Sequence, residues 1–324
     1  QFVGNGAFKK TDIHSIAFSN KLTYIGNRLF SDCTKLKKVS IPASVKGINP
    51  GAFSNCVSLR SINVASDNGK YSSQDGVLYN KNKTRLIQYP MHKVTKSFTV
   101  PSSVKNIRGY SFAGNSYLQK VTITAKKIGK QAFYNMDNLS DVTITDGAEV
   151  IADNAFREDS SLKNVDLPDS LTNIGSYAFS GSAIRTVNIP SGLKKLGYCA
   201  FGNCYKLKKF EGGNGKKYRV KDDVLYNGKG TTLIQYPAKK ADTRFVVPNR
   251  VKNVKSYAFD HVSKMKALEL GHSFRNLAYK SITKCSRLKS VMFTCRTADD
   301  RLYINSRAVA NCDQLAVIIG PNSY

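Results

Sequence analysis

Cysteine and histidine are the residue types in this chain that could bind a metal ion or attack an electrophile. The 324 residues include seven cysteines and four histidines. No two cysteines form a C-x-x-C pair, and no zinc-type spacing occurs. The histidines, His14, His92, His261 and His272, cluster neither with one another nor with cysteine. We therefore expect no metal site and no cofactor.

Other catalytic signatures are also missing from the sequence. It has no H-E-x-x-H, no G-x-x-x-x-G-K-[ST] and no G-x-S-x-G. The Gly-rich stretch "EGGNGKKYRV" at 211–220 leads into another β-prone phrase rather than a helix, so we expect a plain turn and not a phosphate loop. Paired carboxylates occur at Asp222–Asp223 and at Asp299–Asp300, without a partner base. The sequence predicts that the chain is not an enzyme.

The cysteines follow an internal repeat of 21–23 residues with the frame L-x-x-V-x-I-P-x-x-V-x-x-I-x-x-x-A-F-x-x-C-x-x-L. The Phe position recurs at Phe8, Phe30, Phe53, Phe112, Phe133, Phe156, Phe179, Phe201 and Phe259, and continues at Ile282 and Val309. The frame covers nearly the whole chain. It predicts about ten or eleven coils, which favours a single domain over residues 1–324.

Five cysteines share one position, three residues after the Phe position: Cys33, Cys56, Cys204, Cys285 and Cys312. Asn115, Met136, Asp159 and Ser182 occupy the same position in other coils. A position that accepts small or soft residues favours buried free thiols. A disulfide between adjacent coils, such as Cys33 with Cys56, is the alternative, whereas Cys199 and Cys295 occur outside the position and indicate nothing.

Each repeat has two halves with different periodicity. The V-x-I half alternates, which is typical of a short strand with one buried face. The I-x-x-x-A-F-x-x-C-x-x-L half has apolar residues three and four apart, which predicts a short helical or 3-10 turn. One such unit cannot bury its own apolar face, but stacked neighbours can. The expected fold is therefore a β-rich repeat solenoid.

The phrases "IPASVKGINPGAFSNCVSLRSI" and "IPSGLKKLGYCAFGNCYKLKKF" resemble the BspA-like class of leucine-rich repeats, found on surface proteins of bacteria and some protozoan parasites. The resemblance recurs in register along most of the chain. It departs from the commonest leucine-rich pattern because no asparagine follows the strand. It implies a curved solenoid, a secreted or surface location, and a role in binding or adhesion.

One sixteen-residue phrase occurs twice. "DGVLYNKNKTRLIQYP" at 75–90 returns as "DDVLYNGKGTTLIQYP" at 222–237, 147 residues later. Two β-prone runs flank a turn-rich stretch in each copy, which predicts β-hairpins inserted at about 66–98 and 213–245. Because neighbouring marks repeat at the same offset, the chain contains a duplicated block. We expect the tyrosines of the phrase, Tyr79, Tyr89, Tyr226 and Tyr236, to be packed.

The charge is strongly positive. Fifty Lys and Arg against 22 Asp and Glu give a net charge of +28, which attracts anions at long range. Nucleic acid, anionic polysaccharide, lipopolysaccharide and acidic proteins would all respond, and a highly soluble surface is the alternative explanation.

No apolar run approaches the roughly 18 residues of a membrane span. The chain opens at Gln1 within a repeat, so we expect a mature or trimmed fragment.

The repeat places basic residues in columns. The residue after the first Leu of each coil is basic in seven of ten coils. The next residue, and the residue between the Val and Ile of the strand, should face outward from the sheet on its concave side. Together they give the candidate binding residues Lys37, Lys38, Arg60, Lys120, Lys163, Arg185, Lys208, Lys209, Lys266 and Lys289. The alternative is that these charges maintain solubility and discourage sheet association.

These columns suggest two functions. The first is a surface or secreted module that binds a host or matrix protein, or an anionic polysaccharide, through the sheet face. The second is a structural spacer that displays other domains of a larger protein. We expect no specific nucleic-acid binding, because the sequence has no groove-reading helix motif and its aromatic residues fall at core phases. A monomer without a membrane span is expected.

Overall fold

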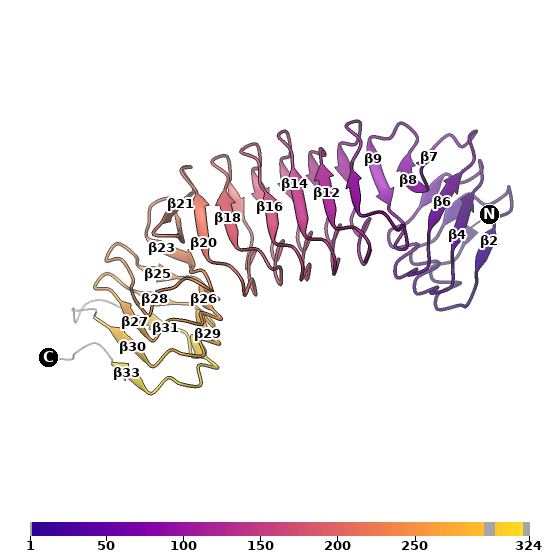
Figure 1. The fold of residues 1–324 in the computed structure, drawn as a ribbon. Helices are drawn as coiled ribbons and strands as arrows, with labels where there is room; N and C mark the ends of the chain where they lie inside the picture. The colour runs from indigo at the N-terminus through magenta and orange to yellow at the C-terminus, as the bar shows by residue number, and fades with distance from the viewer. Residues whose placement is uncertain (1, 295–301, 320–324) are drawn as a thin grey trace. The chain divides into compact units, whose positions relative to one another are not determined.

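The computed structural model describes residues 2–294 and 302–319, and the fold is a β-solenoid of about 13 turns. The chain forms two compact units, residues 1–182 with 196–200 and residues 183–195 with 201–324. Successive coils place their strands side by side, as β12, β14 and β16 do in the first unit (Figure 1). The predicted repeat solenoid is confirmed, with more coils than the frame indicated.

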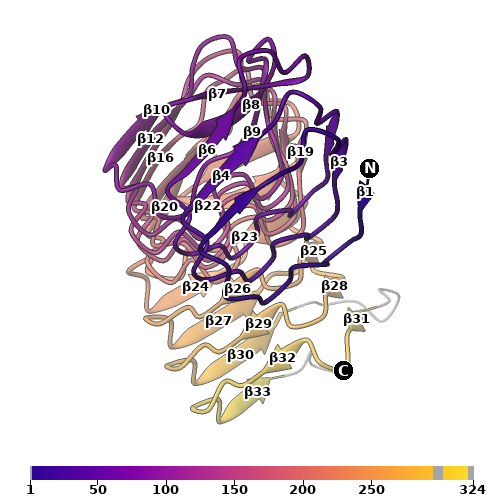
Figure 2. The ribbon, with the colours of Figure 1, turned by 90° about the vertical axis from the view of Figure 1, so that its right-hand side faces the viewer.

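Each coil contributes one strand to a first layer of parallel pairs. In the first unit these strands are β2 (Ser15–Ala17), β4 (Lys38–Ile41), β6 (Ser61–Val64), β10 (Ser97–Thr99), β12 (Lys120–Ile123), β14 (Asp141–Ile144) and β16 (Asn164–Asp166). In the second unit they are β18 (Thr186–Ile189), β20 (Lys209–Gly212), β24 (Arg244–Val246), β27 (Ala267–Leu270), β30 (Ser290–Phe293) and β33 (Val317–Ile319). Figure 2 shows β24, β27, β30 and β33 stacked in order.

A second layer consists of one further strand from each coil, usually two residues long. They are β1 (Phe2–Val3), β3 (Tyr24–Ile25), β5 (Gly47–Ile48), β9 (Arg85–Gln88), β11 (Asn106–Ile107), β13 (Lys127–Ile128), β15 (Val150–Ile151), β17 (Asn173–Ile174), β19 (Lys195–Leu196), β23 (Thr232–Gln235), β25 (Asn253–Val254), β28 (Asn276–Leu277) and β31 (Tyr303–Ile304). In the second unit, a third short ladder contains β26 (Phe259–Asp260), β29 (Ile282–Thr283) and β32 (Val309–Ala310).

The segment around the Phe position is a pair of turns, and no helix of any type occurs among residues 2–294 and 302–319. In most of these segments, two residues four apart have left-handed backbone, such as Arg28 (φ 52°) and Asp32 (φ 63°). Left-handed residues interrupt a right-handed helix. The apolar residues three and four apart therefore lie on tight turns and not on the predicted helical or 3-10 turn. Amide groups alternate between bonds within the coil, as Ser31 N–H to Arg28 O (3.1 Å), and bonds to the next coil, as Phe30 N–H to Ala52 O (2.8 Å).

A column of stacked rings fills the centre of the first unit. Phe112, Phe133, Phe156 and Phe179 stack face to face, with centroid separations of 4.5, 4.9 and 5.2 Å. Each ring is fully buried, and each stack is fixed by a backbone bond such as Phe133 N–H to Ala155 O at 2.8 Å. The small Ala of the A-F pair is therefore a backbone acceptor that leaves room for the ring beside it.

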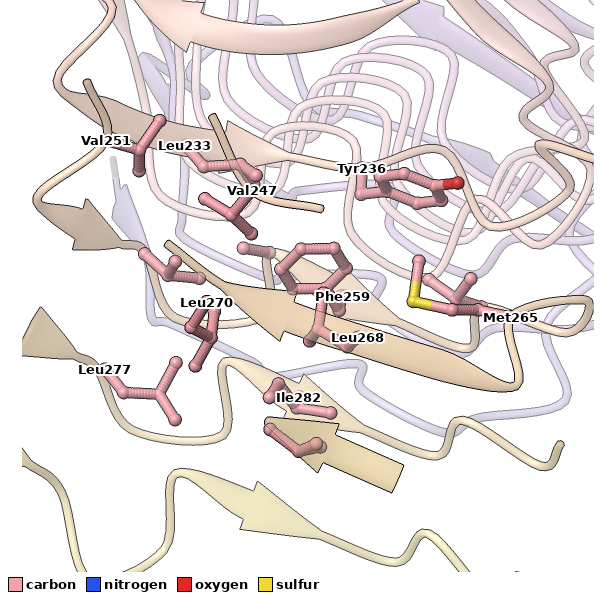
Figure 3. Packing of buried hydrophobic residues seen from close by; sticks show 14 of the residues in the cluster. Leu233, Tyr236, Val247, Val251, Phe259, Met265, Leu268, Leu270, Leu277 and Ile282 are labelled. Carbon is pink, nitrogen blue, oxygen red and sulfur yellow. The ribbon is translucent and has the colours of Figure 1, made fainter. Parts of the chain in front are cut away.

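The second unit has a comparable core from Val224 to Ala308. Figure 3 shows the Phe259 ring between Tyr236 of the preceding coil and Ile282 of the following coil. The Tyr236 and Phe259 centroids are 5.3 Å apart. The aliphatic residue Ile282 thus continues the Phe column, which explains why the frame tolerates it.

The two β-prone runs of each sixteen-residue phrase form the predicted antiparallel hairpin, because β8 (Val77–Asn80) pairs with β9 and β22 (Val224–Asn227) pairs with β23. A strand just before each phrase, which was not predicted, extends it into a further hairpin: β7 (Tyr71–Gln74) pairs with β8, and β21 (Tyr218–Lys221) pairs with β22. The turn of this further hairpin has left-handed backbone at two residues, Asp75 and Gly76 in the first copy and Asp222 and Asp223 in the second. Such a pair is the requirement of a type I′ turn. The final strand of each copy, β9 or β23, belongs to the coil itself, because it pairs in parallel with β11 or β25.

In each hairpin coil, tyrosine replaces the Phe of the ring column. Tyr89 stacks on Phe112 with centroids 4.8 Å apart, and its hydroxyl bonds Thr95 Oγ1 at 2.5 Å. Tyr236 donates to Asp242 Oδ2 at 2.8 Å. Thr95 and Asp242 stand six residues later, where other coils have the frame Leu. A hydrogen-bonded pair therefore takes the place of the apolar Phe–Leu pair of the other coils. Because the Leu is absent, these two coils do not match the repeat frame. The four phrase tyrosines are buried as predicted.

We expect Tyr89→Phe to lower the free energy of unfolding by about 0.5–1.5 kcal/mol, since Thr95 loses its partner while the ring stack remains. The double variant Tyr89→Phe/Thr95→Leu recreates the pair of the other coils and should recover most of this loss. Denaturant titration followed by circular dichroism measures both. A double variant less stable than either single variant would contradict the exchange.

Candidate functional site

The outward face of the first layer carries the predicted polar columns in strict register. Lys38 pairs with Ser61, Lys120 with Asp141, and Thr186 with Lys209. The next outward column pairs Ser40 with Asn63 and Thr122 with Thr143. The intervening residues, such as Val39 and Val121, are buried. Parallel pairing brings equivalent side chains of adjacent coils to about 4.8 Å from one another, which is close enough for one ligand to contact several of them.

All ten predicted basic residues are exposed. Five lie in the first unit: Lys37, Lys38, Arg60, Lys120 and Lys163. Five lie in the second unit: Arg185, Lys208, Lys209, Lys266 and Lys289. Backbone bonds define their column, because Arg60 N–H donates to Lys37 O (2.8 Å) and Lys289 N–H donates to Lys266 O (2.8 Å). The structure therefore brings several of them side by side within each unit.

The basic column also contains residues that the sequence frame missed. The carbonyl of His14 accepts from Lys37 N–H (2.9 Å), and that of Lys96 accepts from Gln119 N–H (2.8 Å). Thr243 stands in the same place before Lys266. Their coils lack the frame Leu or Val, so periodicity alone did not align them.

Carboxylates share part of this face. Asp141 accepts from Asn164 Nδ2 (2.7 Å) and Ser140 Oγ (2.6 Å), and these bonds lower the pKa of its carboxyl. In the second unit, Glu211 forms an ion pair with Lys209, and Glu269 pairs with Arg244 at 2.9 Å. Unlike those of β14, β16, β20 and β27, the outward and basic columns of the consecutive strands β2, β4 and β6 contain no carboxylate. We call Lys37, Lys38 and Arg60 on these strands the N-terminal patch.

Some aromatic residues lie outside the core, contrary to the sequence prediction. Tyr24, Tyr110, Tyr198, Tyr205, Tyr279 and Tyr303 are exposed. Tyr110 has left-handed backbone, and Tyr198 and Tyr279 each precede such a residue. Tyr110, Tyr198, Tyr205 and Tyr279 stand on the turn segments, whereas Tyr24 and Tyr303 belong to the second-layer strands β3 and β31. All six lie outside the apolar positions of the repeat frame.

The shared cysteine position is buried in four of its five coils. Cys33, Cys56, Cys204 and Cys285 are buried, Cys312 and the separate Cys199 are partly exposed, and none of these six forms a disulfide. Cys56 Sγ–H donates to Phe30 O at 3.0 Å, and burial raises the pKa of its thiol to about 12. Cys295 and the Asp299–Asp300 pair lie outside the described residues. Residues 2–294 and 302–319 hold no cluster of three or more potential metal ligands.

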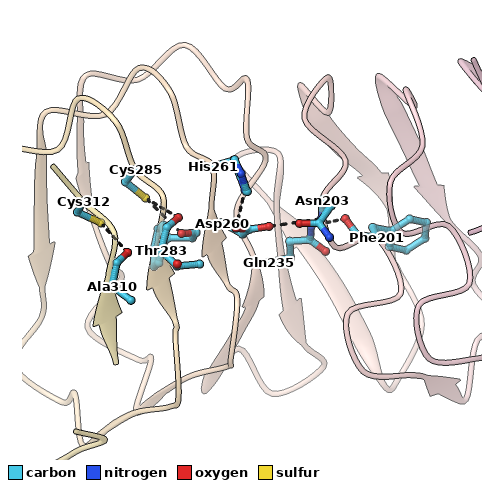
Figure 4. A network of polar contacts seen from close by, with 10 residues as sticks. Phe201, Asn203, Gln235, Asp260, His261, Thr283, Cys285, Ala310 and Cys312 are labelled. Atoms are coloured by element: carbon cyan, nitrogen blue, oxygen red, sulfur yellow. Dashed lines mark hydrogen bonds and ion pairs between the residues drawn. The ribbon is translucent and has the colours of Figure 1, made fainter. Parts of the chain in front are cut away.

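One histidine lies against a carboxylate in the second unit. His261 Nδ1 lies 2.7 Å from Asp260 Oδ1, and Asp260 Oδ2 accepts a long bond from Asn203 N–H at 3.4 Å (Figure 4). Gln235 Nε2 donates to Phe201 O at 2.9 Å in the same region. These bonds join the coils on either side of the second hairpin. The group contains no nucleophile beside the imidazole, so we assign it a structural role.

The first hairpin coil creates two hollows within the first unit. Leu86 pairs with Ile107 and Tyr89 stacks on Phe112. Tyr89 follows Leu86 by three residues, whereas Phe112 follows Ile107 by five, so the turn segment of the hairpin coil is two residues shorter. The shorter turn leaves a recess of about 530 Å³ between the turns of Pro50 and Tyr110. A second hollow of about 410 Å³ opens at the second layer, and Lys46, Lys70, Arg85 and Arg108 contribute its charges.

The second hairpin has a smaller hollow of its own, about 260 Å³, lined by Arg219, Lys221, Tyr226, Gly230, Pro248 and Arg250. Its three charged residues are all cations. Burial raises the pKa of the Tyr226 phenol, so this side chain stays neutral. None of these hollows follows from the repeat frame, because they form where the hairpins interrupt the coils.

A parallel β-solenoid with a Phe column, Pro-terminated strands and exposed polar columns defines a repeat protein of the leucine-rich class. The family model described as "BspA type Leucine rich repeat region" matches six copies over residues 1–92, 89–208 and 239–324. The chain belongs to this BspA-type leucine-rich-repeat family. The resemblance inferred from the sequence is thereby confirmed. No curated protein sequence matches the chain.

Several bacterial crystal structures share the fold. A leucine-rich cell surface protein of Faecalibacterium prausnitzii is 23% identical, with a TM-score of 0.61 over 94% of this chain and 81% of that one. A leucine-rich-repeat protein of Eubacterium ventriosum is 22% identical (TM-score 0.53), and this chain spans 65% of its length. A protein of Bacteroides ovatus is 21% identical (TM-score 0.52; 98% and 72% covered). Within residues 2–294 and 302–319, no helix could cross a membrane.

Asp159 provides a test of the buried cysteine position. It is buried, its Oδ1 accepts from Met136 N–H at 2.8 Å, and its Oδ2 has no partner. Burial raises the pKa of this carboxyl well above its usual value. A raised folded-state pKa favours the folded state below the unfolded value of about 3.9, and this stability is lost as pH rises toward the folded-state value.

We expect Asp159→Asn to increase the free energy of unfolding by about 1–3 kcal/mol at pH 7 and to change it little near pH 3. The neutral amide keeps the acceptor for Met136 and removes the uncompensated charge. Thermal unfolding across pH measures the difference. An equal effect at both pH values would show that ionisation of Asp159 is not the cause.

Proposed function

We propose that the chain is a non-catalytic binding and adhesion module, secreted or displayed on a cell surface. Its partner is a host or matrix protein, or an anionic polysaccharide, recognised through the outward face of the first layer and the flanking basic column. The observation that carries the proposal is the N-terminal patch. There, Lys37, Lys38 and Arg60 are exposed on paired strands beside small polar residues.

The chemistry of the patch favours an extended anionic ligand. Ser40, Ser61 and Asn63 are short, so they leave the strands accessible and offer hydrogen bonds. The cations recur from coil to coil on a backbone fixed by the ladder, so little order is lost on binding. The surface-protein description of the F. prausnitzii relative supports the location. The net charge of +28 would speed encounter with any polyanion.

A structural spacer remains the second candidate, and one observation favours it. Asp141 and Asp166 on β14 and β16 are interspersed with Lys120 and Lys163, so the charges of this part of the face partly cancel. Mixed charge of this kind keeps a surface soluble without recognising a ligand. Binding experiments therefore need to separate the N-terminal patch from the rest of the face.

We expect the variant Lys37→Glu/Lys38→Glu/Arg60→Glu to weaken binding to immobilised heparin, or to a matrix protein found on an array, by at least about tenfold in 0.1 M salt. Tenfold corresponds to about 1.4 kcal/mol. The control Lys10→Glu/Lys127→Glu/Lys130→Glu makes the same charge change at exposed positions away from this face and should have a smaller effect.

Salt titration gives a second readout. Binding by exposed cations weakens as the Debye length falls from about 10 Å at 0.1 M to about 3 Å at 1 M. Equal losses in the two triple variants would mean that only net charge matters. If neither variant changes any binding event, the spacer becomes the better description.

A further inference from the structure

The hollow at the second layer of the first unit arises from a break in strand pairing. β5 pairs with β3 on one side, whereas β9 pairs with β8 and β11. β5 and β9 are not paired with each other, because the inserted hairpin occupies this part of the coil. The backbone of Ile48 on β5 must therefore find partners other than a neighbouring strand.

Two side chains replace the missing strand. Ile48 N–H donates to the Tyr71 hydroxyl at 2.9 Å, and Arg108 Nη1 donates to Ile48 O at 3.1 Å. Arg108 reaches across the hairpin coil from the coil after it to the coil before it. Satisfying this carbonyl uses one of the five N–H donors of a guanidinium. A purely structural account therefore leaves most of the Arg108 donors unexplained.

The charges around Arg108 are all of one sign. Lys46, Lys70 and Arg85 line the same hollow, and no carboxylate is among the lining residues Lys46, Ile48, Lys70, Tyr71, Asn80, Arg85, Ile87, Asn106 and Arg108. Burial lowers the pKa of Arg108, and the neighbouring Arg85 acts in the same direction. Gathering three exposed cations around the partly buried guanidinium of Arg108 is unfavourable without an anion, since burial of an unpaired charge is costly.

The position of Arg108 also departs from the repeat. Its column, the residue after the second-layer strand, contains Gly26, Gly129, Ala152 and Gly175 in other coils of this unit, and Asn49 in the coil before the hairpin. A Cβ added at Gly129 would lie 2.5 Å from Gly109 N, so close backbone approach excludes larger residues there. After the first hairpin the column accommodates an arginine, because the shortened coil leaves space. This substitution is the sequence signal that would have indicated the site.

From this geometry we infer that Lys46, Lys70, Arg85 and Arg108 form a binding site for a sugar carrying sulfate or phosphate ester groups. The arginine forks match oxyanion geometry, and the lysines supply further charge. The volume of about 410 Å³ lies in the range of small-molecule sites and exceeds the needs of a bare ion. Tyr71 and Asn106 add polar groups at the wall. The site does not rest on the proposed function, because it lies at the second layer.

The test is calorimetric titration of the full chain with a sulfated heparin disaccharide and with the same disaccharide after desulfation. We expect saturable binding at one site, at least tenfold weaker for the desulfated sugar. Competition by inorganic sulfate and by inorganic phosphate, measured separately, shows which ester the site prefers. Absence of saturable binding, or equal binding of the two disaccharides, would overturn the inference.

Variants locate the binding. Lys70 and Arg85 are exposed, so Lys70→Gln/Arg85→Gln should fold normally and weaken binding at least fivefold. Arg108→Gln should weaken it more, with thermal unfolding recorded because the bond to Ile48 is lost. The controls are Lys127→Gln/Lys130→Gln and the triple variant of the N-terminal patch, which should leave disaccharide affinity unchanged. If Lys70→Gln/Arg85→Gln binds as well as the unmodified chain, the site is not in this hollow.

Discussion

The structure depends on an interaction that no coil can make alone. The Phe N–H of one coil bonds the carbonyl before the Phe of the next, while the two rings stack, as for Phe133 and Phe156. A coil therefore acquires its backbone partners and its apolar burial together, from the same neighbour. This requirement fixes the register of every other column. The outward lysines are aligned because the inward phenylalanines are.

The sequence predicted this alignment well. Periodicity predicted the strand register, the buried thiols and the ten exposed cations, because each depends on contacts that recur from coil to coil. The repeated sixteen-residue phrase predicted the two insertions. The left-handed turn residues were missed, since apolar spacing does not distinguish two tight turns from a helical turn. The coils containing Tyr89 and Tyr236 were missed because their hydrogen-bonded pairs replaced the Phe–Leu pairs that define the frame.

The cationic hollow shows a different limit. Lys46, Lys70, Arg85 and Arg108 come from three coils and one hairpin, and what brings them together is an absent strand pairing. A repeat frame contains the positions that the coils have in common, whereas this cluster occurs where the hairpin coil departs from the frame. In this fold, regularity builds the scaffold and departures from regularity provide the distinctive chemistry.

The interruption between β5 and β9 also bears on how the first unit unfolds. In a stack with nearest-neighbour coupling, cooperativity passes from coil to coil through the interfaces between them. Here strand pairing of the second layer is replaced by two side-chain bonds, from Tyr71 and Arg108. The coils before the hairpin are thus coupled less tightly to those after it. We therefore expect them to open as a separate cooperative segment in hydrogen exchange while the Phe112–Phe179 column stays protected.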